Sequence, residues 1–336
     1  MILSIFLTVF SIFWRERLKI YTPKDLPLPF ETVITIGSFD GIHLGHQTLF
    51  EETLNLSSAL KSEPVVVSFD PHPRMVLFPE SEFKLLTTLE EKIHLLSASR
   101  IKNLLLIPFT KTLSELSPDL FVQEYIVDKL RAKGVIVGFN FRFGKKKMGN
   151  VDYLEQIAQK YNFIVKAVPP VILNGVTISS STIRNLIAKA QIEEANKLLG
   201  RPYFILGKVI KGKGRGKNLG FPTANIEVSP LKMLPPAGVY AVLVTVNGEK
   251  FKGALNIGKR PTFEEKDFSV EVYIFNFNKE IYGKTLKVEI IKHIREEKKF
   301  SSTEELKTQI KKDCELIDKI LSQSFPFFFN SSTNLS

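Results

Sequence analysis

The sequence predicts two domains of different class: a parallel α/β domain, followed by an antiparallel β-barrel or sandwich that closes with a helix. The length of 336 residues suggests two domains. In the first part of the chain, strand-like apolar runs alternate with helical patterns, which is typical of a parallel sheet. From about Leu199 onward, strand-like runs follow one another without long helices, which is typical of antiparallel pairing.

The first domain is expected to be doubly wound. Its strands are predicted at Val33–Ile36, Pro64–Phe69, Leu104–Ile107, Val135–Val137 and Phe163–Val168. Its helices are predicted at Gln47–Leu60, Leu89–Ser99, Pro118–Leu130 and Asp152–Tyr161. Ligands of such sheets bind beyond the carboxyl ends of the strands.

The second domain is expected to consist of strands joined by tight turns such as Asn247-Gly248 and Tyr282-Gly283. Its strands are predicted at Tyr203–Lys211, Gly238–Asn247, Phe251–Ile257, Ser269–Phe277 and Lys284–Lys292. A final helix is predicted over Thr303–Leu321, with a capping box formed by Ser302 and Glu305. Its buried stripe is expected to comprise Leu306, Ile310, Ile317 and Ile320.

Composition narrows the class of partner. The net charge is +11 and the pI is about 9.4, which suits nucleotides, nucleic acid or a membrane surface. The single cysteine, Cys314, excludes an internal disulfide and fits a reducing cytosol. The apolar run in residues 1–14 is short for a membrane span, which needs about 20 residues.

The most informative stretch is residues 35–46, which read TIGSFDGIHLGH between a predicted strand and a predicted helix. Gly37, Gly41 and Gly45 permit a tight turn and close approach of a ligand. His43 and His46 are three residues apart, so they share one face at the start of the helix. A helix N-terminus favours anions, so this stretch is interpreted as a phosphate site.

Polar motifs follow three further strands of the first domain. They read SFDPHPR at residues 68–74, VGFNFRFGKKKMGN at 137–150 and ISSSTIR at 178–184. Because the carboxyl ends of parallel strands meet at one edge, all four motifs are expected to cluster there.

A basic glycine-rich loop, KGKGRGKNLGFPT, occupies residues 211–223 of the second domain. A phosphate-binding loop is one interpretation, although the segment fails the Walker A pattern because Asn218 follows Lys217. The other interpretations are a flexible basic turn and a nucleic-acid contact. Thr223 and Asn225, which follow it, are two residues apart, so on an extended chain they share one face.

Together these motifs resemble bacterial FAD synthetases, the bifunctional riboflavin kinase/FMN adenylyltransferases. The resemblance covers residues 18 to 322 and rests on the ordered set from H-x-G-H, at residues 43–46, to PTAN, at 222–225. It implies a Rossmann-like nucleotidylyltransferase domain at 18–198 and a β-barrel flavokinase domain at 199–322. Residues 18–21 resemble the family's usual opening, so residues 1–17 are expected to be a dispensable extension or an artefact of start assignment. Residues 323–336 are expected to form a disordered tail.

In the first domain, the resemblance implies that FMN and ATP give FAD and pyrophosphate. The phosphate of FMN is already largely dianionic at neutral pH, so the reaction needs no general base. His43 and His46 are the expected catalytic donors. The expected nucleotide- and flavin-binding residues are Gly37, Phe39, Asp40, Gly41, Asn140, Ser179, Ser180, Ser181 and Arg184. His72 is interpreted either as a flavin contact or as a turn residue, and Asn150 stands where the family usually has Asp.

In the second domain, the resemblance implies that riboflavin and ATP give FMN and ADP. The riboflavin hydroxyl needs a base, and Glu271 matches the family's position for it, with Glu289 and Glu227 as weaker candidates. Thr223 and Asn225 offer hard oxygen ligands for Mg²⁺ on the ATP phosphates. The expected nucleotide- and flavin-binding residues are Gly212, Gly216, Lys217, Thr223, Asn225 and Arg295.

Two other functions are weighed against this one. A single-activity nucleotidylyltransferase would have lost Thr223, Asn225 and Glu271, yet all three are present. A basic nucleic-acid-binding or regulatory protein would place stacking aromatics among its lysines, and Phe141 and Phe143 beside residues 145–147 are the main such hint. The expected partners are therefore riboflavin, FMN, FAD and ATP, without nucleic acid or membrane, in the cytoplasm.

Overall fold

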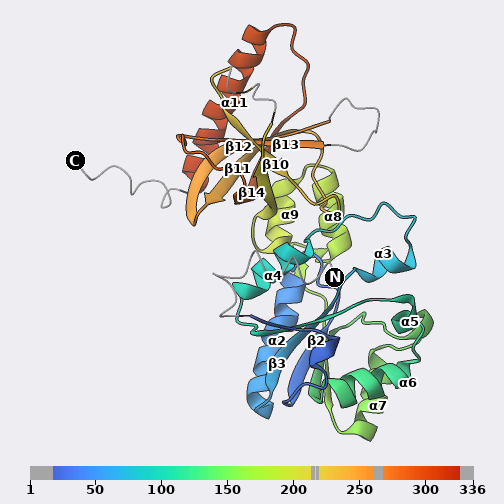
Figure 1. Cartoon of the computed structure of the whole chain (residues 1–336). Helices are drawn as coiled ribbons and strands as arrows, with labels where there is room; N and C mark the ends of the chain where they lie inside the picture. The colour runs from blue at the N-terminus through green and yellow to red at the C-terminus, as the bar shows by residue number, and fades with distance from the viewer. Residues whose placement is uncertain (1–17, 213–215, 217–218, 260–267, 326–336) are drawn as a thin grey trace. The chain divides into compact units, whose positions relative to one another are not determined.

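The computed structural model describes residues 18–212, 216, 219–259 and 268–325. The chain divides into two compact units, residues 1–180 and 181–336, both drawn in Figure 1. The predicted extension at residues 1–17 lies outside the described residues, as do residues 326–336 of the predicted tail. The domain boundary between residues 198 and 199 stays a prediction.

A parallel sheet of six strands forms the first unit, in the order β1-β4-β3-β2-β5-β6. Its strands are β1 (Lys19–Tyr21), β2 (Thr32–Ile36), β3 (Glu63–Phe69), β4 (Asn103–Ile107), β5 (Ala132–Gly138) and β6 (Ile164–Val168). All five predicted strands and their parallel pairing are confirmed. β1 is an addition: three residues carry no clear pattern, and they form a strand because they pair with β4. A small hairpin follows, with β7 (Ile172–Leu173) and β8 (Val176–Thr177).

Helices connect these strands. They are η1 (Pro23–Asp25), α2 (Leu44–Leu60), α3 (Pro73–Leu77), α4 (Leu89–Ser97), α5 (Lys111–Ser114), α6 (Pro118–Phe121), η2 (Val122–Lys129), η3 (Lys145–Lys147) and α7 (Val151–Tyr161). The four predicted helices are present with two corrections. α2 begins three residues earlier than expected because His43 caps it. The helix expected over 118–130 divides into α6 and the π-helix η2, whose wider turns the 3.6-residue pattern did not indicate.

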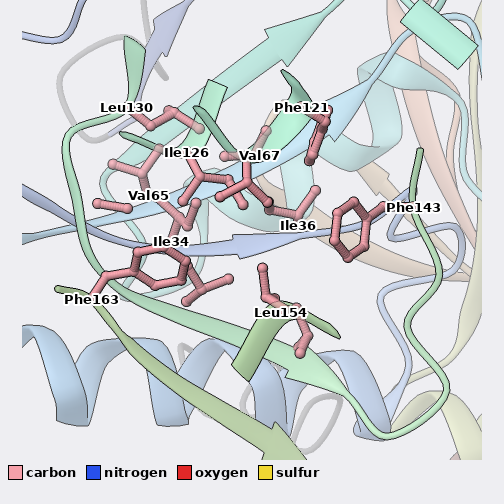
Figure 2. Packing of buried hydrophobic residues seen from close by; sticks show 14 of the residues in the cluster. Ile34, Ile36, Val65, Val67, Phe121, Ile126, Leu130, Phe143, Leu154 and Phe163 are labelled. Atoms are coloured by element: carbon pink, nitrogen blue, oxygen red, sulfur yellow. The ribbon is translucent and has the colours of Figure 1, made fainter. Parts of the chain in front are cut away.

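Both faces of the parallel sheet are covered, which explains why its strands are apolar almost without interruption. On one face Phe50 of α2 joins a cluster with Val33 of β2. On the other face, Ile126 of η2 and Leu154 of α7 join a cluster with Ile34 (Figure 2). Consecutive residues of β2 thus enter different cores, as the period of two in a strand requires.

The strand order places a topological switch point between β2 and β5. From β2 the chain proceeds outward through β3 to β4, then returns to the other side of β2 to form β5 and β6. The crevice outside the carboxyl ends of two such strands is the general ligand site of open α/β sheets. The TIGSFDGIHLGH motif leaves β2 and the VGFNFRFG motif leaves β5, so both border this crevice.

A closed antiparallel barrel forms most of the second unit, with the order β10-β13-β12-β11-β14-β9. Of the two predicted architectures, the second domain is therefore a barrel and not a sandwich. Its strands are β9 (Tyr203–Ile210), β10 (Thr223–Glu227), β11 (Gly238–Val246), β12 (Glu249–Lys259), β13 (Phe268–Ile274) and β14 (Thr285–Glu296). Helices α8 (Ser180–Ala188) and α9 (Ile192–Leu199) precede the barrel, and α9 packs against β9 and β14.

Helix α11 (Thr303–Ser324) packs against β11 and β12 of the barrel (Figure 1). It extends three residues beyond its predicted end, so Gln323 and Ser324, assigned to the tail, are helical. The hydroxyl of Ser302 caps the helix as predicted, but the Glu305 carboxylate accepts from Ser301 instead of from Ser302. The buried residues of the helix are Asp313, Ile317 and Leu321, which are four residues apart and share one face; Leu306, Ile310 and Ile320 are half-buried.

Candidate active sites

The loop between β2 and α2 has a tight conformation that depends on its residue types. Phe39, Gly41 and Ile42 all have positive φ, at 46°, 94° and 39°. Gly37 lies against the Phe39 ring, where an added Cβ would come within 3.1 Å of a ring carbon. The chain therefore reverses within a few residues and delivers His43 to the first turn of α2.

His43 is the N-cap of α2, and its Nδ1 accepts a hydrogen bond from the backbone N–H of His46 at 3.3 Å. A nitrogen that accepts carries no proton, so this geometry requires a neutral His43 with its proton on Nε2. The side chain is buried, with 6% of its surface exposed. His43 thus has one N–H donor on its ring, at Nε2, while Nδ1 holds the helix start.

His46 stacks on His43, with ring centroids 3.6 Å apart and an interplanar angle of 18°. The edge of Phe39 supports it at 5.3 Å between centroids. Phe39 itself is 1% exposed and also contacts Phe50, so it acts as a core support for His46. The two predicted catalytic histidines are therefore brought together, whereas the predicted nucleotide-binding Phe39 belongs to the core.

Asp40 fastens this loop to the rest of the unit. Its carboxylate accepts hydrogen bonds from the N–H groups of Leu86 and Thr87 at 3.1 and 2.9 Å, and the Thr87 hydroxyl accepts from Gly41 N–H. The side chain is 1% exposed. These contacts give the Asp40 carboxylate a role in loop structure. Nucleotide binding by Asp40 stays a prediction.

The serine motif meets the same loop. The hydroxyl of Ser180 donates to the backbone carbonyl of Asp40 at 2.8 Å, which joins residues 140 apart in sequence. Ser180 is the first residue of α8, and Ser179 precedes it. Ser181 and Arg184 follow three residues apart in the first turns of this helix, and so lie on one face of it.

The remaining motifs of this edge separate into exposed and structural residues. Asn140 is exposed in the turn after β5. Asn150 caps α7, because its Oδ1 accepts from Tyr153 N–H at 2.8 Å. His72 caps α3 in the same way through Arg74 N–H and lies against Phe83, which supports the turn interpretation.

One buried residue of this edge was not predicted from the sequence. Lys92 of α4 is 6% exposed, and its Nζ donates to the Ser38 carbonyl at 2.7 Å and to the Ser68 hydroxyl at 2.9 Å. In the sequence, Lys92 follows two glutamates at the start of a helix, which is the pattern of a solvated face. Its proximity to Ser38 and Ser68 arises from the packing of α4 and carries no local sequence signal.

In the second unit, β10 and β13 bring the predicted metal ligands and the predicted base together. Thr223 pairs with Tyr273 and Asn225 pairs with Glu271 across the two strands. The hydroxyl of Thr223 donates to Oε2 of Glu271 at 3.0 Å. Directly opposed residues share one face of a sheet, so Thr223, Asn225 and Glu271 form one cluster.

The glycine-rich loop closes on this cluster. Gly212 lies so near the Asn225 amide that an added Cβ would overlap Nδ2. An added Cβ at Gly216 would come within 3.1 Å of the Thr223 hydroxyl. Both predicted glycines therefore lie against the predicted metal ligands. Lys217 lies outside the described residues.

The two weaker candidates for the base have other environments. Glu289 is buried and forms ion pairs of 2.9 Å with Lys250 and Lys287, which hold its pKa below the usual value although burial acts in the opposite direction. Glu227 is exposed at the end of β10. Glu271 accepts a hydrogen bond from the Thr223 hydroxyl, and the described contacts of Glu289 and Glu227 do not include one.

Arg295, a predicted ligand-binding residue near the end of β14, makes a two-pronged ion pair with the buried Asp313 of α11. Its Nε and Nη2 each lie 2.9 Å from Oδ2. Gln309 also donates to Asp313, at 2.8 Å. These contacts join the last barrel strand to α11. Ligand binding by Arg295 stays a prediction.

A cavity of about 330 Å³ adjoins the second cluster. It extends from Thr223 and Val209 to the turn after β13, and its lining includes Phe277 and Tyr282. Of the cluster residues, Thr223 lines this cavity, whereas Asn225 and Glu271 are not part of its lining. Among the described residues, no group of three or more His, Cys, Asp or Glu could hold a metal ion.

The two parts of the chain that contain these clusters match two known families. Residues 27–182 match the FAD synthetase family and residues 199–321 match the riboflavin kinase family. A bifunctional riboflavin kinase/FMN adenylyltransferase of Buchnera aphidicola is 39% identical over 86% of this chain and 93% of its own length. The enzyme of the same description from Bacillus subtilis is 39% identical over 84% of this chain and 90% of its own length.

A solved structure is also similar over nearly the whole chain. It is described as a macrolide-efflux protein from Streptococcus pneumoniae, with a TM-score of 0.82 and 32% identity, covering 89% of this chain and 98% of that one. That description applies to the other protein. Among the helices described for the present chain, none is long and apolar enough to cross a membrane.

Proposed function

The chain belongs to the family of bifunctional riboflavin kinase/FMN adenylyltransferases, and from this premise we propose which of its residues carry each reaction. It phosphorylates riboflavin with ATP to give FMN, and then adenylylates FMN with ATP to give FAD. The two clusters differ in their chemical groups, and each set of groups suits one of the two reactions. One has stacked imidazoles at a helix N-terminus and the other has a carboxylate bonded to a hydroxyl.

Adenylyl transfer belongs to the His43/His46 cluster. A phosphate oxygen of FMN attacks the α-phosphorus of ATP, the bond to the bridging oxygen breaks, and pyrophosphate leaves. Since the nucleophile is already ionised, the site has to position the reactants and stabilise negative charge. His43 donates through Nε2 and His46 through its own ring N–H, and the start of α2 adds its N–H groups and positive dipole end. Ser179 and Ser181 supply hydroxyls and Arg184 a guanidinium for the leaving phosphates, while the Ser180 hydroxyl holds the motif to the loop through the Asp40 carbonyl.

Riboflavin phosphorylation belongs to the Thr223/Asn225/Glu271 cluster. Glu271 accepts the proton of the riboflavin 5′-hydroxyl as its oxygen attacks the γ-phosphorus of ATP, and ADP leaves. The Thr223 hydroxyl donates to Glu271, which fixes the orientation of the carboxylate. Gly212 and Gly216 allow the loop backbone to approach the phosphates.

Magnesium fits the donor set of this second cluster. The Thr223 hydroxyl can keep its bond to Glu271 and still offer a lone pair, and Asn225 offers an amide oxygen. Both are neutral hard oxygens of the kind that holds Mg²⁺ together with substrate phosphates. When bound, the ion would neutralise phosphate charge. We place both reactions in the cytoplasm, since the sequence has a single cysteine and no disulfide.

The observation that carries this proposal is the bond between Thr223 and Glu271, because it unites the predicted metal ligand and the predicted base. The test incubates the pure protein and two variants with riboflavin, ATP and Mg²⁺ and separates the flavins. His46→Ala should accumulate FMN and lose FAD formation by at least roughly 10²-fold, the scale for one lost transition-state donor. Glu271→Gln should form no FMN from riboflavin, yet convert added FMN to FAD.

The crossed design supplies its own controls. Each variant keeps the reaction of the other cluster, so retained activity shows that the unmodified unit has folded, and the thermal midpoint of the variant checks the unit that carries the substitution. Equal loss of FMN formation in His46→Ala would contradict the assignment of the histidines. Near-normal FMN formation by Glu271→Gln would transfer the role of the base to another carboxylate.

A further inference from the structure

Lys92 is buried at the carboxyl edge of the parallel sheet, between two of its motifs. Its ammonium donates to the carbonyl of Ser38, in the loop after β2, and to the hydroxyl of Ser68, at the end of β3. The Ser68 hydroxyl also lies 3.3 Å from the Ser38 carbonyl, to which it donates. These three groups form a closed triangle that joins the loops of two neighbouring strands.

The charge of this lysine is compensated locally. The Asp40 and Asp70 carboxylates, from the loops after β2 and β3, act on the ammonium and favour its charged form. On its own helix, Glu91 is committed to the Thr88 N–H, and Glu90 is half-buried with a raised pKa. A buried ammonium is costly unless it is paired and hydrogen-bonded. A lysine is therefore an unfavourable residue at a buried position whose only role is packing.

We propose that Lys92 is a positioning residue for adenylyl transfer, whose ammonium fixes the loop that carries His43 and His46 relative to the segment 68–74. Ser38 stands five residues before His43 in this tight loop, and Phe39, the next residue, supports the His46 ring. A shift of the Ser38 carbonyl would therefore move both imidazoles. The inference rests on the proposed assignment of adenylyl transfer to these histidines.

The charge state of Lys92 gives this role a signature in pH. Burial lowers the pKa of Lys92 to about 8, with the two aspartates opposing the shift. As pH rises through this value the ammonium loses a proton, its bonds to Ser38 and Ser68 weaken, and adenylyl transfer should decline. Between about 8 and the ordinary lysine pKa of about 10.4 the unfolded chain binds more protons, so this group makes folding more favourable as pH rises. A loss of activity caused by deprotonation of Lys92 in this window is therefore not accompanied by a loss of stability from this group.

The first experiment uses the unmodified protein. Adenylyl transfer from FMN and riboflavin phosphorylation are measured separately across pH, together with the thermal midpoint. We expect the rate of adenylyl transfer to fall as pH rises through about 8, and we call this fall the alkaline limb. Phosphorylation should not share it, and the thermal midpoint should not fall over the same range. If the unmodified protein failed to adenylylate FMN at all, the proposed function would fail, and not this inference.

The second experiment compares three variants. Lys92→Met removes the charge at similar length and should lower kcat/KM for adenylyl transfer by about 10- to 100-fold, as expected when reacting groups are misplaced. It should also remove the alkaline limb and leave phosphorylation unchanged. Lys133→Met is the matched control, because Lys133 is an exposed lysine near the start of β5 that pairs with Glu31. It should leave both reactions and the limb unchanged.

Ser68→Ala keeps the inference testable if Lys92→Met does not fold. It deletes one acceptor of the ammonium, so the charged form loses a bond and the alkaline limb should move to lower pH. Its fall in kcat should exceed any change in KM. The inference is overturned if Ser68→Ala leaves both the limb and kcat in place, or if a folded Lys92→Met matches Lys133→Met in adenylyl transfer and differs only in thermal midpoint.

Discussion

A single hydroxyl links two proposed functions in the second unit. Thr223 donates to Glu271 and presents its oxygen toward the loop that contains Gly216. Removal of this hydroxyl therefore has two separable consequences, on the orientation of the base and on the binding of a metal. The neighbouring Asn225, which pairs with Glu271 across the strands, retains its amide in either case.

Thr223→Ala should raise the Mg²⁺ concentration needed for half-maximal riboflavin phosphorylation by about 10-fold or more, the scale of losing one group around a bound metal. The measurement is a Mg²⁺ titration of FMN formation. Thr223→Ser is the control, because it keeps the hydroxyl and should titrate almost as the unmodified protein does. An unchanged titration for Thr223→Ala would remove Thr223 from the metal ligands.

The hydrogen bond between the two histidines determines which ring nitrogen of His43 carries the proton. Because Nδ1 of His43 accepts from His46 N–H, protonation of that nitrogen would break the helix cap. The neutral ring is thus the form that both caps α2 and donates through Nε2. The sequence spacing indicated two donors at a helix start, but it did not show that one nitrogen of the first histidine is an acceptor.

At the scale of secondary-structure elements, helix α7 depends on its cap. Asn150, which stands where the family usually has Asp, accepts from Tyr153 N–H, and an aspartate would do the same. The departure from the family pattern therefore preserves the start of the helix.

Asn150→Ala should destabilise the protein by about 1 kcal/mol, the usual cost of a lost N-cap, whereas Asn150→Asp should cost little. The measurement is equilibrium unfolding in denaturant, read as the midpoint of the transition that the first unit undergoes. Adenylyl transfer at a temperature below that transition should persist in both variants. A large loss of adenylyl transfer in folded Asn150→Ala would instead indicate contact with substrate.

The glycine-rich loop is a second element whose function depends on close approach. Gly212→Ala would force a methyl group into the Asn225 amide, so the loop or the amide has to shift. Riboflavin phosphorylation should fall by about 10²-fold, as expected for misplacement of about 1 Å at a reacting centre. Adenylyl transfer by the same protein should be unchanged.

Gly175→Ala is not a suitable control, because Gly175 has a φ of 76° and would be strained by any side chain. Gly138→Ala is better, since an added Cβ there meets its nearest neighbour, Asn140 Oδ1, at 3.6 Å, an ordinary contact. It should leave phosphorylation intact. Full phosphorylation by Gly212→Ala would show that the loop tolerates displacement.

At the scale of the whole molecule, the chain has two proposed sites with different chemistry, one around His43 and His46 and one around Thr223, Asn225 and Glu271. Neither cluster contains a residue of the other, and each reaction has its own donors. The product of the phosphorylation is the substrate of the adenylyl transfer, so FMN has to travel from one site to the other.

An equimolar mixture of His46→Ala and Glu271→Gln should therefore form FAD from riboflavin, although neither variant does so separately. Glu271→Gln would adenylylate the FMN that His46→Ala releases. The measurement is a time course of FMN and FAD, with a lag in FAD that shortens as protein concentration rises. Accumulation of FMN without FAD in the mixture would show that FMN does not exchange between molecules.

The sequence by itself determined the class of each domain and the family to which the chain belongs. Apolar runs with a period of two or 3.6 are local, so they predicted five of the six strands of the parallel sheet and the final helix. The motifs at residues 35–46 and 222–225 are also local, and a parallel sheet gathers the ends of its strands at one edge. The resemblance built on them is confirmed by the family matches.

The tertiary structure decided what depends on residues that are distant in sequence. It closed the strands into a barrel, made β1 a strand by pairing it with β4, and shifted the buried stripe of α11. It also brought Lys92 to Ser38, assigned Asp40 to Thr87, and joined Thr223 to Glu271. Each of these is a contact between separate elements, and its energy comes from burial and hydrogen bonding that no local pattern records.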